Sequence, residues 1–289
     1  MRKTYKVAGH VFAIVMPDNA AGWDEMQNYE PFLAEDSGHC LFVAEQAVLP
    51  DTSEKVKFTV CCNAPREPRF DIFDWQDRWL MEVAPMYESP ICFRMVLEKD
   101  FSKVQFQIDE HWKFSFNTLM KLLFSFATAS LFTLQVHSSV TMKDGKGYLF
   151  LGRSGTGKST HSQLWINKLE GCSLLNDDNP IIRICEDGVA RVYGSPWSGK
   201  TPCYRNLNVP IGAIVKLRQA KKNVIRKMSV TEAYATIYTS FTGMKFVKEQ
   251  ADAYHATNLK LVNIVPFYEL DCLPNAEAAF LCYETVSRQ

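Results

Sequence analysis

Apolar side chains in residues 1–110 fall in short runs separated by turn residues. These runs are rich in β-branched and aromatic residues and cover 11–15, 41–43, 56–60, 70–73, 91–97 and 104–108. Runs of about four to eight such residues, bounded by Gly, Pro, Asn and Asp, are typical of β-strands. The pattern therefore predicts a β-rich N-terminal domain over residues 1–115, built from antiparallel strands.

A helical pattern replaces the strand pattern near Asn117. Between Leu119 and Leu131, apolar side chains surround most of the helical circumference, which indicates a buried helix. Asn117 is a residue type that caps helix N-termini well, so we expect the helix to begin there. The change of pattern places the boundary between the two domains at residues 115 and 116.

Residues 116–289 mix strand and helix signals, so the predicted fold class is α/β. An Asp144-Gly145 turn, favoured because both residues tolerate positive φ, joins predicted strands at 134–143 and 146–151. A second Asp-Gly turn follows at 187–188, and Ser229 with Glu232 has the spacing of a capping box. Further expected elements are strands at 211–217 and 267–270, and helices from 229 to about 241, at 247–261 and from about 275.

Composition narrows the classes of function. The 289-residue chain carries 32 Lys and Arg against 32 Asp and Glu, so its net charge is zero at pH 7. It lacks the basic field that drives nonspecific nucleic-acid binding, and we expect no nucleic-acid partner. The apolar stretch 119–134 is interrupted by Lys121 and Ser125, which favours a buried helix over a membrane span. Nine cysteines without a Cys-x-x-Cys pair indicate a reducing compartment, so we expect a soluble, cytoplasmic protein.

One segment matches a phosphate-binding motif at every position. Residues 152–159 read Gly-Arg-Ser-Gly-Thr-Gly-Lys-Ser, which fits Gly-x-x-x-x-Gly-Lys-[Ser/Thr]. The glycines let successive amide N–H groups turn toward one anion, and the following helix adds its positive end. We expect Lys158 to reach the β- and γ-phosphates of ATP and Ser159 to be a ligand of Mg²⁺. The residues predicted to bind the nucleotide are Gly152, Arg153, Ser154, Gly155, Thr156, Gly157, Lys158, Ser159 and Thr160.

Two carboxylates follow at the end of the next predicted strand. Asp177 comes nineteen residues after Lys158, which leaves room for one helix and one return strand, and Asp178 is adjacent. One carboxylate can hold Mg²⁺ while the other orients or deprotonates an attacking hydroxyl. The pattern does not assign the two roles, and an Asp pair by itself is also typical of a solvated turn.

His137 is predicted to lie beside the phosphate loop. It stands seven residues before Asp144, and Gly152 stands seven residues after Gly145. In a hairpin without a bulge, these two equidistant residues face each other. The alternative interpretation is a structural histidine that takes no part in chemistry.

Together these residues resemble a known family. The order His137-Ser138-Ser139, hairpin, phosphate loop and Leu175-x-Asp177-Asp178 resembles the catalytic domain of HPr kinase/phosphorylase. More distantly, it is similar to the nucleotide site of ATP-dependent phosphoenolpyruvate carboxykinase. The resemblance covers about residues 134–217, and it implies a mixed-sheet nucleotide-binding domain that uses ATP and Mg²⁺.

The resemblance also implies roles for individual residues. Lys158 and Ser159 match the family's phosphate and metal residues, Asp177 and Asp178 match its acidic pair, and His137 matches its upstream histidine. On the resemblance alone, Asp178 is assigned as the catalytic base, and Asp177 joins Ser159 at the metal.

The segment after the Asp pair departs from the family. Its protein kinases carry a Gly-rich signature with an acidic residue near this place, whereas residues 193–200 contain no acid. We therefore expect a divergent relative that acts on a small molecule or a peptide rather than on HPr itself. Ser195, Lys200 and Arg205 are candidates for contact with the acceptor or the transferred phosphoryl group. A surface loop with solvated charges is the alternative.

The predicted function is Mg²⁺-dependent phosphoryl transfer from ATP to a hydroxyl of a small molecule, peptide or protein. Two alternatives are an ATP-binding regulatory module with little turnover and a simple ATPase. No membrane partner is expected. The sequence leaves open the acceptor, the choice between ATP and GTP, and whether the chain forms a homo-oligomer.

Overall fold

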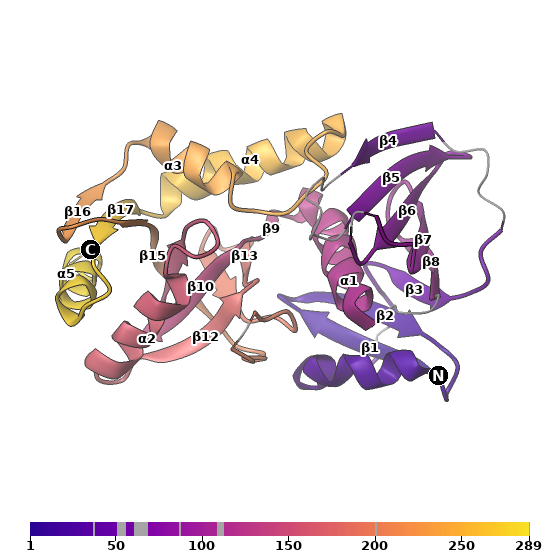
Figure 1. Ribbon diagram of the computed structural model, residues 1–289, viewed down its shortest axis with the longest axis horizontal. Coiled ribbons are helices and arrows are strands. Elements are labelled where there is room, and N and C mark those ends of the chain that lie inside the picture. The colour runs from indigo at the N-terminus through magenta and orange to yellow at the C-terminus, as the bar shows by residue number, and fades with distance from the viewer. Residues whose placement is uncertain are drawn as a thin grey trace. The chain divides into compact units, whose positions relative to one another are not determined.

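The computed structural model describes residues 1–36, 38–50, 56–60, 69–86, 88–108, 113–199 and 201–288. The chain has a mixed α/β fold, as the sequence predicts, with one sheet in each of two units, Met1–Ala127 and Thr128–Gln289 (Figure 1). No helix in the described part of the chain is both long enough and apolar enough to cross a membrane.

An eight-stranded sheet forms the first unit, in the order β1-β2-β3-β8-β7-β6-β5-β4. The short connections among β4 to β8 give antiparallel pairs, as expected. Two pairings are parallel instead, β2 with β3 and β3 with β8. Both join strands separated by long connections, which allow a crossover that a tight turn forbids. The strands are β1 (Arg2–Val7), β2 (His10–Val15), β3 (Val43–Gln46), β4 (Val56–Val60), β5 (Arg69–Trp75), β6 (Arg78–Ala84), β7 (Phe93–Glu98) and β8 (Lys103–Ile108).

Helix α1 (Lys113–Ala127) is buried, as its apolar circumference predicts, but it begins before Asn117. The Asn117 amide does not cap the helix and instead donates to the carbonyl oxygen of Glu25 in η1 (Ala21–Phe32), at 3.1 Å. Phe116 packs against Phe93 and Phe106 of its own sheet, so the helix belongs to the first unit. The units therefore divide after α1, whereas the sequence pattern placed the boundary before it.

The second unit is built on a nine-stranded sheet whose core strand is β15 (Asn208–Gln219). The start of β15 pairs with β14, and the remainder runs parallel to β11 on one side and to β17 on the other. The other pairings are antiparallel. The remaining strands are β9 (Thr133–Gln135), β10 (Ser138–Lys143), β11 (Lys146–Leu151), β12 (Ser173–Asp178), β13 (Ile181–Ile184), β14 (Ala190–Tyr193), β16 (Val224–Lys227) and β17 (Phe267–Cys272).

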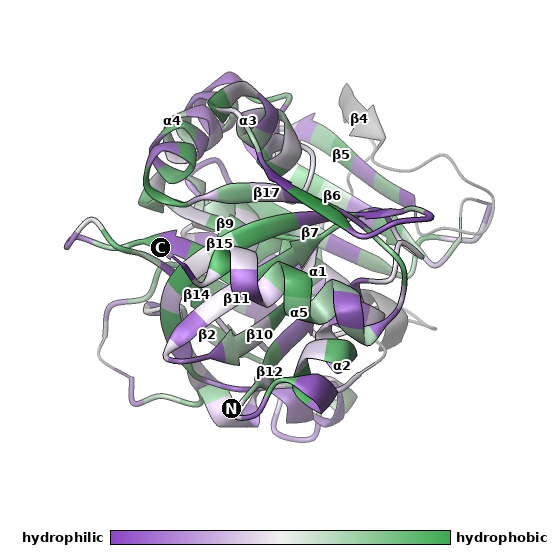
Figure 2. Ribbon diagram, turned by 90° about the vertical axis from the view of Figure 1, so that its left-hand side faces the viewer, coloured by the Kyte–Doolittle hydropathy of each residue, from purple (hydrophilic) through white to green (hydrophobic). Residues whose placement is uncertain are grey.

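Helices cover both faces of this sheet (Figures 1 and 2), and alternate residues of β11 enter the two resulting cores. Leu149 and Leu151 pack toward α3 and α4, whereas Tyr148 and Phe150 pack toward α2 and α5. Side chains on a strand point alternately to the two faces, so a strand buried on both reads as a continuous apolar run. The helices are α2 (Lys158–Lys168), α3 (Val230–Tyr238), α4 (Lys248–Ile264) and α5 (Ala276–Val286), with a short η2 (Ala129–Leu131) before β9.

Local signals in the second unit are confirmed closely. Asp144 and Gly145 both have positive φ, 51° and 73°, and the hairpin pairs Ser138 with Leu151 without a bulge. Ser229 and Glu232 form the predicted capping box at the start of α3. Helix α3 ends at Tyr238, before the expected 241, because the next residues pair with the strand edge at Val136.

Candidate functional site

The predicted phosphate loop connects β11 to α2. Gly157 caps the helix in a left-handed conformation, with φ 104°, which a residue with a side chain rarely adopts. The Lys158 side chain folds back over the loop. Its Nζ donates to the carbonyl oxygen of Gly152 at 3.0 Å and lies 3.0 Å from His137 Nε2. The cation therefore lies over the loop, where the motif expects phosphate charge.

Burial makes Lys158 easier to deprotonate than an ordinary lysine. Desolvation lowers its pKa, and the Asp178 and Asp177 carboxylates oppose that shift. A buried ammonium without a full countercharge gains most from an added anion, because desolvation disfavours its charged form. The side chain is thus suited to receive phosphate oxygens.

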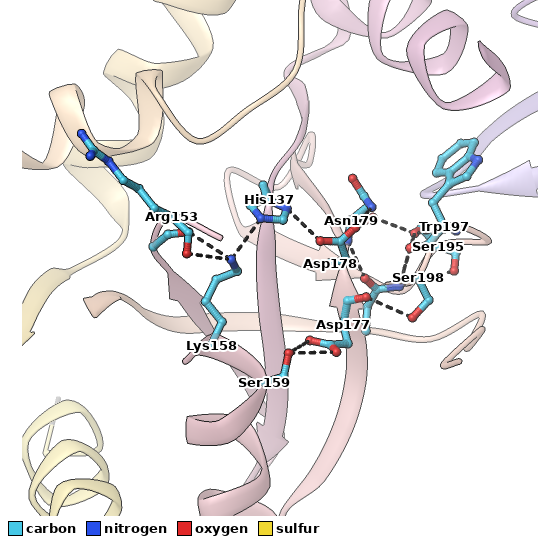
Figure 3. A network of polar contacts seen from close by, with 12 residues as sticks. His137, Arg153, Lys158, Ser159, Asp177, Asp178, Asn179, Ser195, Trp197 and Ser198 are labelled. Carbon is cyan, nitrogen blue, oxygen red and sulfur yellow. Dashed lines mark hydrogen bonds and ion pairs between the residues drawn. The ribbon is translucent and has the colours of Figure 1, made fainter. Parts of the chain in front are cut away.

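Asp177 faces the first turn of α2. The Ser159 hydroxyl donates toward its carboxylate, with Oγ 3.0 and 3.1 Å from Oδ1 and Oδ2. Asp177 is only 5% exposed. A serine hydroxyl and a buried carboxylate thus converge on one point beside the phosphate loop (Figure 3).

Asp178 turns the opposite way and meets His137. Its Oδ1 lies 2.8 Å from His137 Nδ1, and its Oδ2 accepts from Asn179 Nδ2 at 2.6 Å. Asp178 has φ 113°, an unusual value for a residue with a side chain. This twist ends the strand and lets two adjacent carboxylates serve one site from different directions (Figure 3).

The contacts of His137 determine which ring nitrogen carries a proton. An ammonium can only donate, so Lys158 requires Nε2 of His137 to accept. In a neutral ring the proton is then on Nδ1, which donates to Asp178. His137 therefore links the lysine over the phosphate loop to the second aspartate. This places it beside the loop, as the hairpin register predicts.

A buried amide holds the segment after the Asp pair against β12. Asn176 Nδ2 lies 3.2 Å from the Trp197 carbonyl oxygen and 3.3 Å from Ser195 Oγ, and its Oδ1 accepts from the Asn179 backbone N–H at 3.0 Å. The Ser195 hydroxyl donates to the Asn179 carbonyl oxygen at 2.6 Å. Asn176 and Ser195 are fully buried, so this network fixes the turn that carries the aspartates.

Residues 198 and 199 hydrogen-bond to the backbone of the Asp pair. Ser198 Oγ donates to the Asp177 carbonyl oxygen at 3.0 Å, and the Gly199 N–H donates to the same oxygen at 2.6 Å. A Cβ added at Gly199 would lie 3.0 Å from Asp178 Cβ. A side chain at this position would crowd Asp178, because the loop approaches the aspartate closely.

The structure engages two of the predicted acceptor residues, Ser195 and Arg205, in contacts within the chain. Ser195 is buried in the Asn176 network, and the Arg205 guanidinium bonds the Leu174 carbonyl oxygen, near the opposite end of β12. Lys200 lies outside the described residues. Arg153 is exposed, and its side chain extends away from Lys158 (Figure 3). In contrast, His137, Lys158, Ser159 and both aspartates are brought together.

The residues present fit a magnesium ion. Ser159 and Asp177 supply hard oxygen ligands beside the phosphate loop, and Mg²⁺ is commonly held by one or two carboxylates together with substrate phosphates. No cluster of three or more His, Cys, Asp or Glu in the described residues is arranged as an all-protein metal site.

Sequence reasoning missed the residues that position the site. Asn176 and Asn179 flank the Asp pair, and the run Asn-Asp-Asp-Asn was the available signal. Their role depends on contacts with residues 195, 197 and 203, which the spacing alone does not reveal. Gln219 was also missed, although its Nε2 donates to the Gly155 carbonyl oxygen at 3.2 Å.

Comparison with known proteins gives a distant structural likeness. No family model matches the chain, and no curated protein matches it. A solved structure of the Hpr(Ser) kinase/phosphatase from Coxiella burnetii is similar with a TM-score of 0.32 and 14% sequence identity. The match covers 53% of this chain and 88% of that one.

Proposed function

We propose that the second unit binds Mg²⁺ and ATP and transfers the γ-phosphoryl group to a hydroxyl of a small molecule, peptide or protein. One observation carries the proposal. Lys158, His137 and Asp178 form a continuous chain of contacts at 3.0 and 2.8 Å, beginning over a complete phosphate-loop motif. The sequence resemblance to the HPr kinase/phosphorylase family points to the same class of activity.

The phosphate loop and Lys158 are proposed to bind the triphosphate. The loop amides and the N-terminus of α2 favour an anion at this place. On binding, the Lys158 ammonium would exchange its bonds to the Gly152 carbonyl oxygen and His137 for phosphate oxygens. That exchange would also release His137 Nε2 to meet a second polar group, such as the acceptor or an oxygen of the γ-phosphate.

Ser159 and Asp177 would hold the metal. When bound, Mg²⁺ supplies positive charge that offsets the charge on the β- and γ-phosphates. The buried Asp177 carboxylate accepts hydrogen bonds from Ser159. Among the residues that the structure describes, no basic side chain is hydrogen-bonded to it, which supports a binding role rather than proton transfer.

Asp178 is proposed as the group that accepts the proton of the acceptor hydroxyl. About a third of its side chain is exposed, as is 45% of that of His137, so an acceptor can approach both. His137 and Asn179 orient the two carboxylate oxygens, which keeps one of them directed toward the incoming hydroxyl. The acceptor oxygen would form its new bond to phosphorus as its proton moves to Asp178, and ADP would leave.

The cellular setting is part of the same proposal. No disulfide joins the cysteines that the structure describes. That agrees with a reducing compartment, and we propose that the protein acts in the cytoplasm.

Binding of ATP and its turnover are the measurements that test the function. Lys158→Ala should weaken Mg²⁺·ATP binding by at least tenfold in calorimetry, because the loop loses the cation that faces the phosphates. Lys168→Ala, an exposed lysine at the other end of α2, is the matched control and should bind like the wild type. If Lys158→Ala binds within twofold of the wild type, the phosphate-loop assignment is wrong.

A panel of hydroxyl acceptors with labelled ATP then separates the alternatives. Transfer of label to an acceptor supports the kinase proposal, and release of phosphate without transfer supports an ATPase. Binding without either product supports a regulatory module.

A further inference from the structure

The turn between α3 and α4, residues 239–243, lies against the backbone at His137. We infer that this turn, held in place by Lys245, positions the His137 ring between Lys158 and Asp178 (Figure 3). Lys245 is thus a positioning residue of the candidate site, far from the phosphate-loop motif and the acidic pair in the sequence. Its effect on phosphoryl transfer rests on the proposed function, whereas its effect on the His137 ring does not.

His137 lies in a break between two strands. Strand β9 ends at Gln135 and β10 begins at Ser138, so residues 136 and 137 belong to neither strand. The Val136 N–H donates to the Pro180 carbonyl oxygen at 3.1 Å, which ties one side of the break to the turn after the Asp pair. The backbone N–H of His137 needs a partner on the other side.

The α3–α4 turn supplies that partner. The His137 N–H donates to the Ser240 carbonyl oxygen at 2.7 Å, and the Thr242 N–H donates to the Gln135 carbonyl oxygen at 3.1 Å. These two bonds join the turn to the chain on either side of the break. The direction in which the imidazole leaves the backbone therefore depends on where the turn lies.

Lys245 fastens the turn to the end of α3. Its Nζ donates to the carbonyl oxygen of Tyr238, the last residue of the helix, at 2.5 Å, and to that of Phe241, in the turn, at 3.0 Å. The last carbonyl oxygens of a helix have no partner within it, and a cation at that end is stabilising. The ammonium also lies over the rings of Phe241 and Tyr238, 3.9 and 4.8 Å from their centroids.

The surroundings of Lys245 are uncharged among the residues that the structure describes. No described carboxylate forms an ion pair with it, and burial lowers the pKa of its ammonium to about 8. At pH 7 the side chain is therefore still charged and donates to the two carbonyl oxygens. Methionine would fill similar space without a donor, whereas arginine would keep a charged donor.

Packing against α4 supports the turn from below. A Cβ added at Gly243 would lie 2.4 Å from the Tyr254 ring, and the Phe241 and Tyr254 ring centroids are 4.8 Å apart. Tyr254 is fully buried. Because this apolar contact does not involve Lys245, loss of the ammonium should loosen the turn without unfolding the second unit.

Loosening of the turn should affect transfer more than nucleotide binding. The His137 ring bonds Lys158 and Asp178 only while it keeps its direction, and misplacement of a catalytic group by about 1 Å can cost about 10² in rate. Lys158 has a separate bond to the Gly152 carbonyl oxygen, and the phosphate loop does not contact the turn through Lys245. The site for ATP should therefore persist.

Two substitutions in the full chain at pH 7 test the inference. Lys245→Met should lower the rate constant of transfer at least about fivefold and leave Mg²⁺·ATP affinity within about twofold. Lys245→Arg should restore most of the rate, because its guanidinium still donates to the carbonyl oxygens. Lys248→Met, at an exposed lysine in the first turn of α4, is the matched control and should behave like the wild type. If Lys245→Met does not fold, Lys245→Gln replaces it with the same expectation.

Nitrogen NMR of histidine-labelled protein tests the ring position without ATP or an acceptor. The wild type should show His137 with its proton on Nδ1, as its contacts require, and His137→Gln assigns the signal. Lys245→Met should shift or broaden this signal, and Lys245→Arg and Lys248→Met should not.

The outcomes separate this inference from the proposed function. An unchanged His137 signal in Lys245→Met, or transfer at the wild-type rate by that variant, would overturn the inference and leave the proposed function intact. If the wild type phosphorylates no acceptor, the proposed function fails, and the His137 signal still decides whether Lys245 positions the ring.

Discussion

Asp178 adopts a backbone conformation that only neighbouring contacts can maintain. Its φ of 113° lies in a region that costs residues with side chains about 1–3 kcal/mol. Two hydrogen bonds offset this cost. Asn179 Nδ2 donates to the Asp178 carboxylate, and the Asn179 backbone N–H donates to the Asn176 amide oxygen. In return, Asp177 faces Ser159 while Asp178 faces His137. An extended strand would point two adjacent side chains to opposite faces. The strained backbone of Asp178 instead directs the two carboxylates to different partners beside the same loop, so each can have its own role.

Substitution of each aspartate should produce a different defect. Asp178→Asn should leave Mg²⁺·ATP affinity within about twofold and reduce transfer by about 10²–10⁴, the usual contribution of a positioned general base. Asp177→Asn should weaken Mg²⁺·ATP binding and raise the Mg²⁺ concentration needed, because it removes the charged metal ligand. Calorimetry and single-turnover transfer measure both effects.

Asp187→Asn, in the exposed β13–β14 turn, is the control for this pair and should match the wild type in both assays. Wild-type binding and turnover in both Asp177→Asn and Asp178→Asn would show that the pair takes no part in metal binding or in transfer.

His161 makes stability depend on pH through burial alone. It accepts a hydrogen bond from Trp165 Nε1 at 3.0 Å, and burial lowers its pKa to about 4 from an ordinary 6.5. The unfolded chain therefore binds a proton between pH 4 and 6.5 that the folded chain does not. The free energy of unfolding should rise with pH across this window, by up to ~1.4 kcal/mol per pH unit.

His161→Gln should remove that slope, because Gln accepts the Trp165 bond without titrating. Urea titrations at pH 5, 6 and 7 measure the free energy of unfolding of the second unit in each variant. His255→Gln, at an exposed histidine, is the control. A difference between wild type and His161→Gln that stays constant over this range would contradict the assignment.

At the scale of elements, helix α3 shows how a local signal sets a boundary. Ser229 accepts from the Glu232 N–H, and the Glu232 carboxylate accepts from the Ser229 N–H in return. The bonds satisfy two backbone donors that the first turn of a helix leaves free. The other end of α3 has no such local signal, and its position depends on the pairing of Phe241 with Val136.

Loss of the cap should cost stability without affecting the site. Ser229→Ala should lower the free energy of unfolding by about 1 kcal/mol and the melting temperature by about 2–4 °C. Ser229→Asn is the matched control, because Asn caps helices equally well. Differential scanning calorimetry measures both variants, and ATP affinity should not change. An unchanged melting temperature in Ser229→Ala would mean that α3 is held by its packing alone.

At the scale of the whole molecule, the second unit has cores of its own. Both clusters on the faces of its sheet are drawn from residues after 128, and the candidate site uses no residue of the first unit. A domain of this size buries enough apolar surface to fold by itself.

Residues 128–289 produced alone should therefore fold cooperatively and bind Mg²⁺·ATP within about threefold of the full chain. Thermal unfolding by circular dichroism and calorimetry measure this, and Lys158→Ala in the same shorter chain is the non-binding control. Failure to fold would show that the second unit needs the first, and weak binding by a folded unit would show that residues 1–127 support the site.

The sequence alone determined the features that depend on neighbours along the chain. The Asp144-Gly145 hairpin, the capping box of α3 and the form of the phosphate loop follow from local φ preferences and short-range hydrogen bonds. The hairpin register also predicted that His137 lies beside the loop, because residues equidistant from a tight turn face each other.

Tertiary structure alone decided what depends on residues far apart in the chain. The parallel pairing of β2, β3 and β8 follows long connections whose path no local preference records. The charge of Arg205 predicts a phosphate ligand. Its guanidinium instead donates to the Leu174 carbonyl oxygen of β12, a contact that only the folded chain brings within reach. The turn that directs Asp178 toward His137 depends on Asn176 and on the close approach of Gly199, contacts that form only when residues 195–199 fold against the strand.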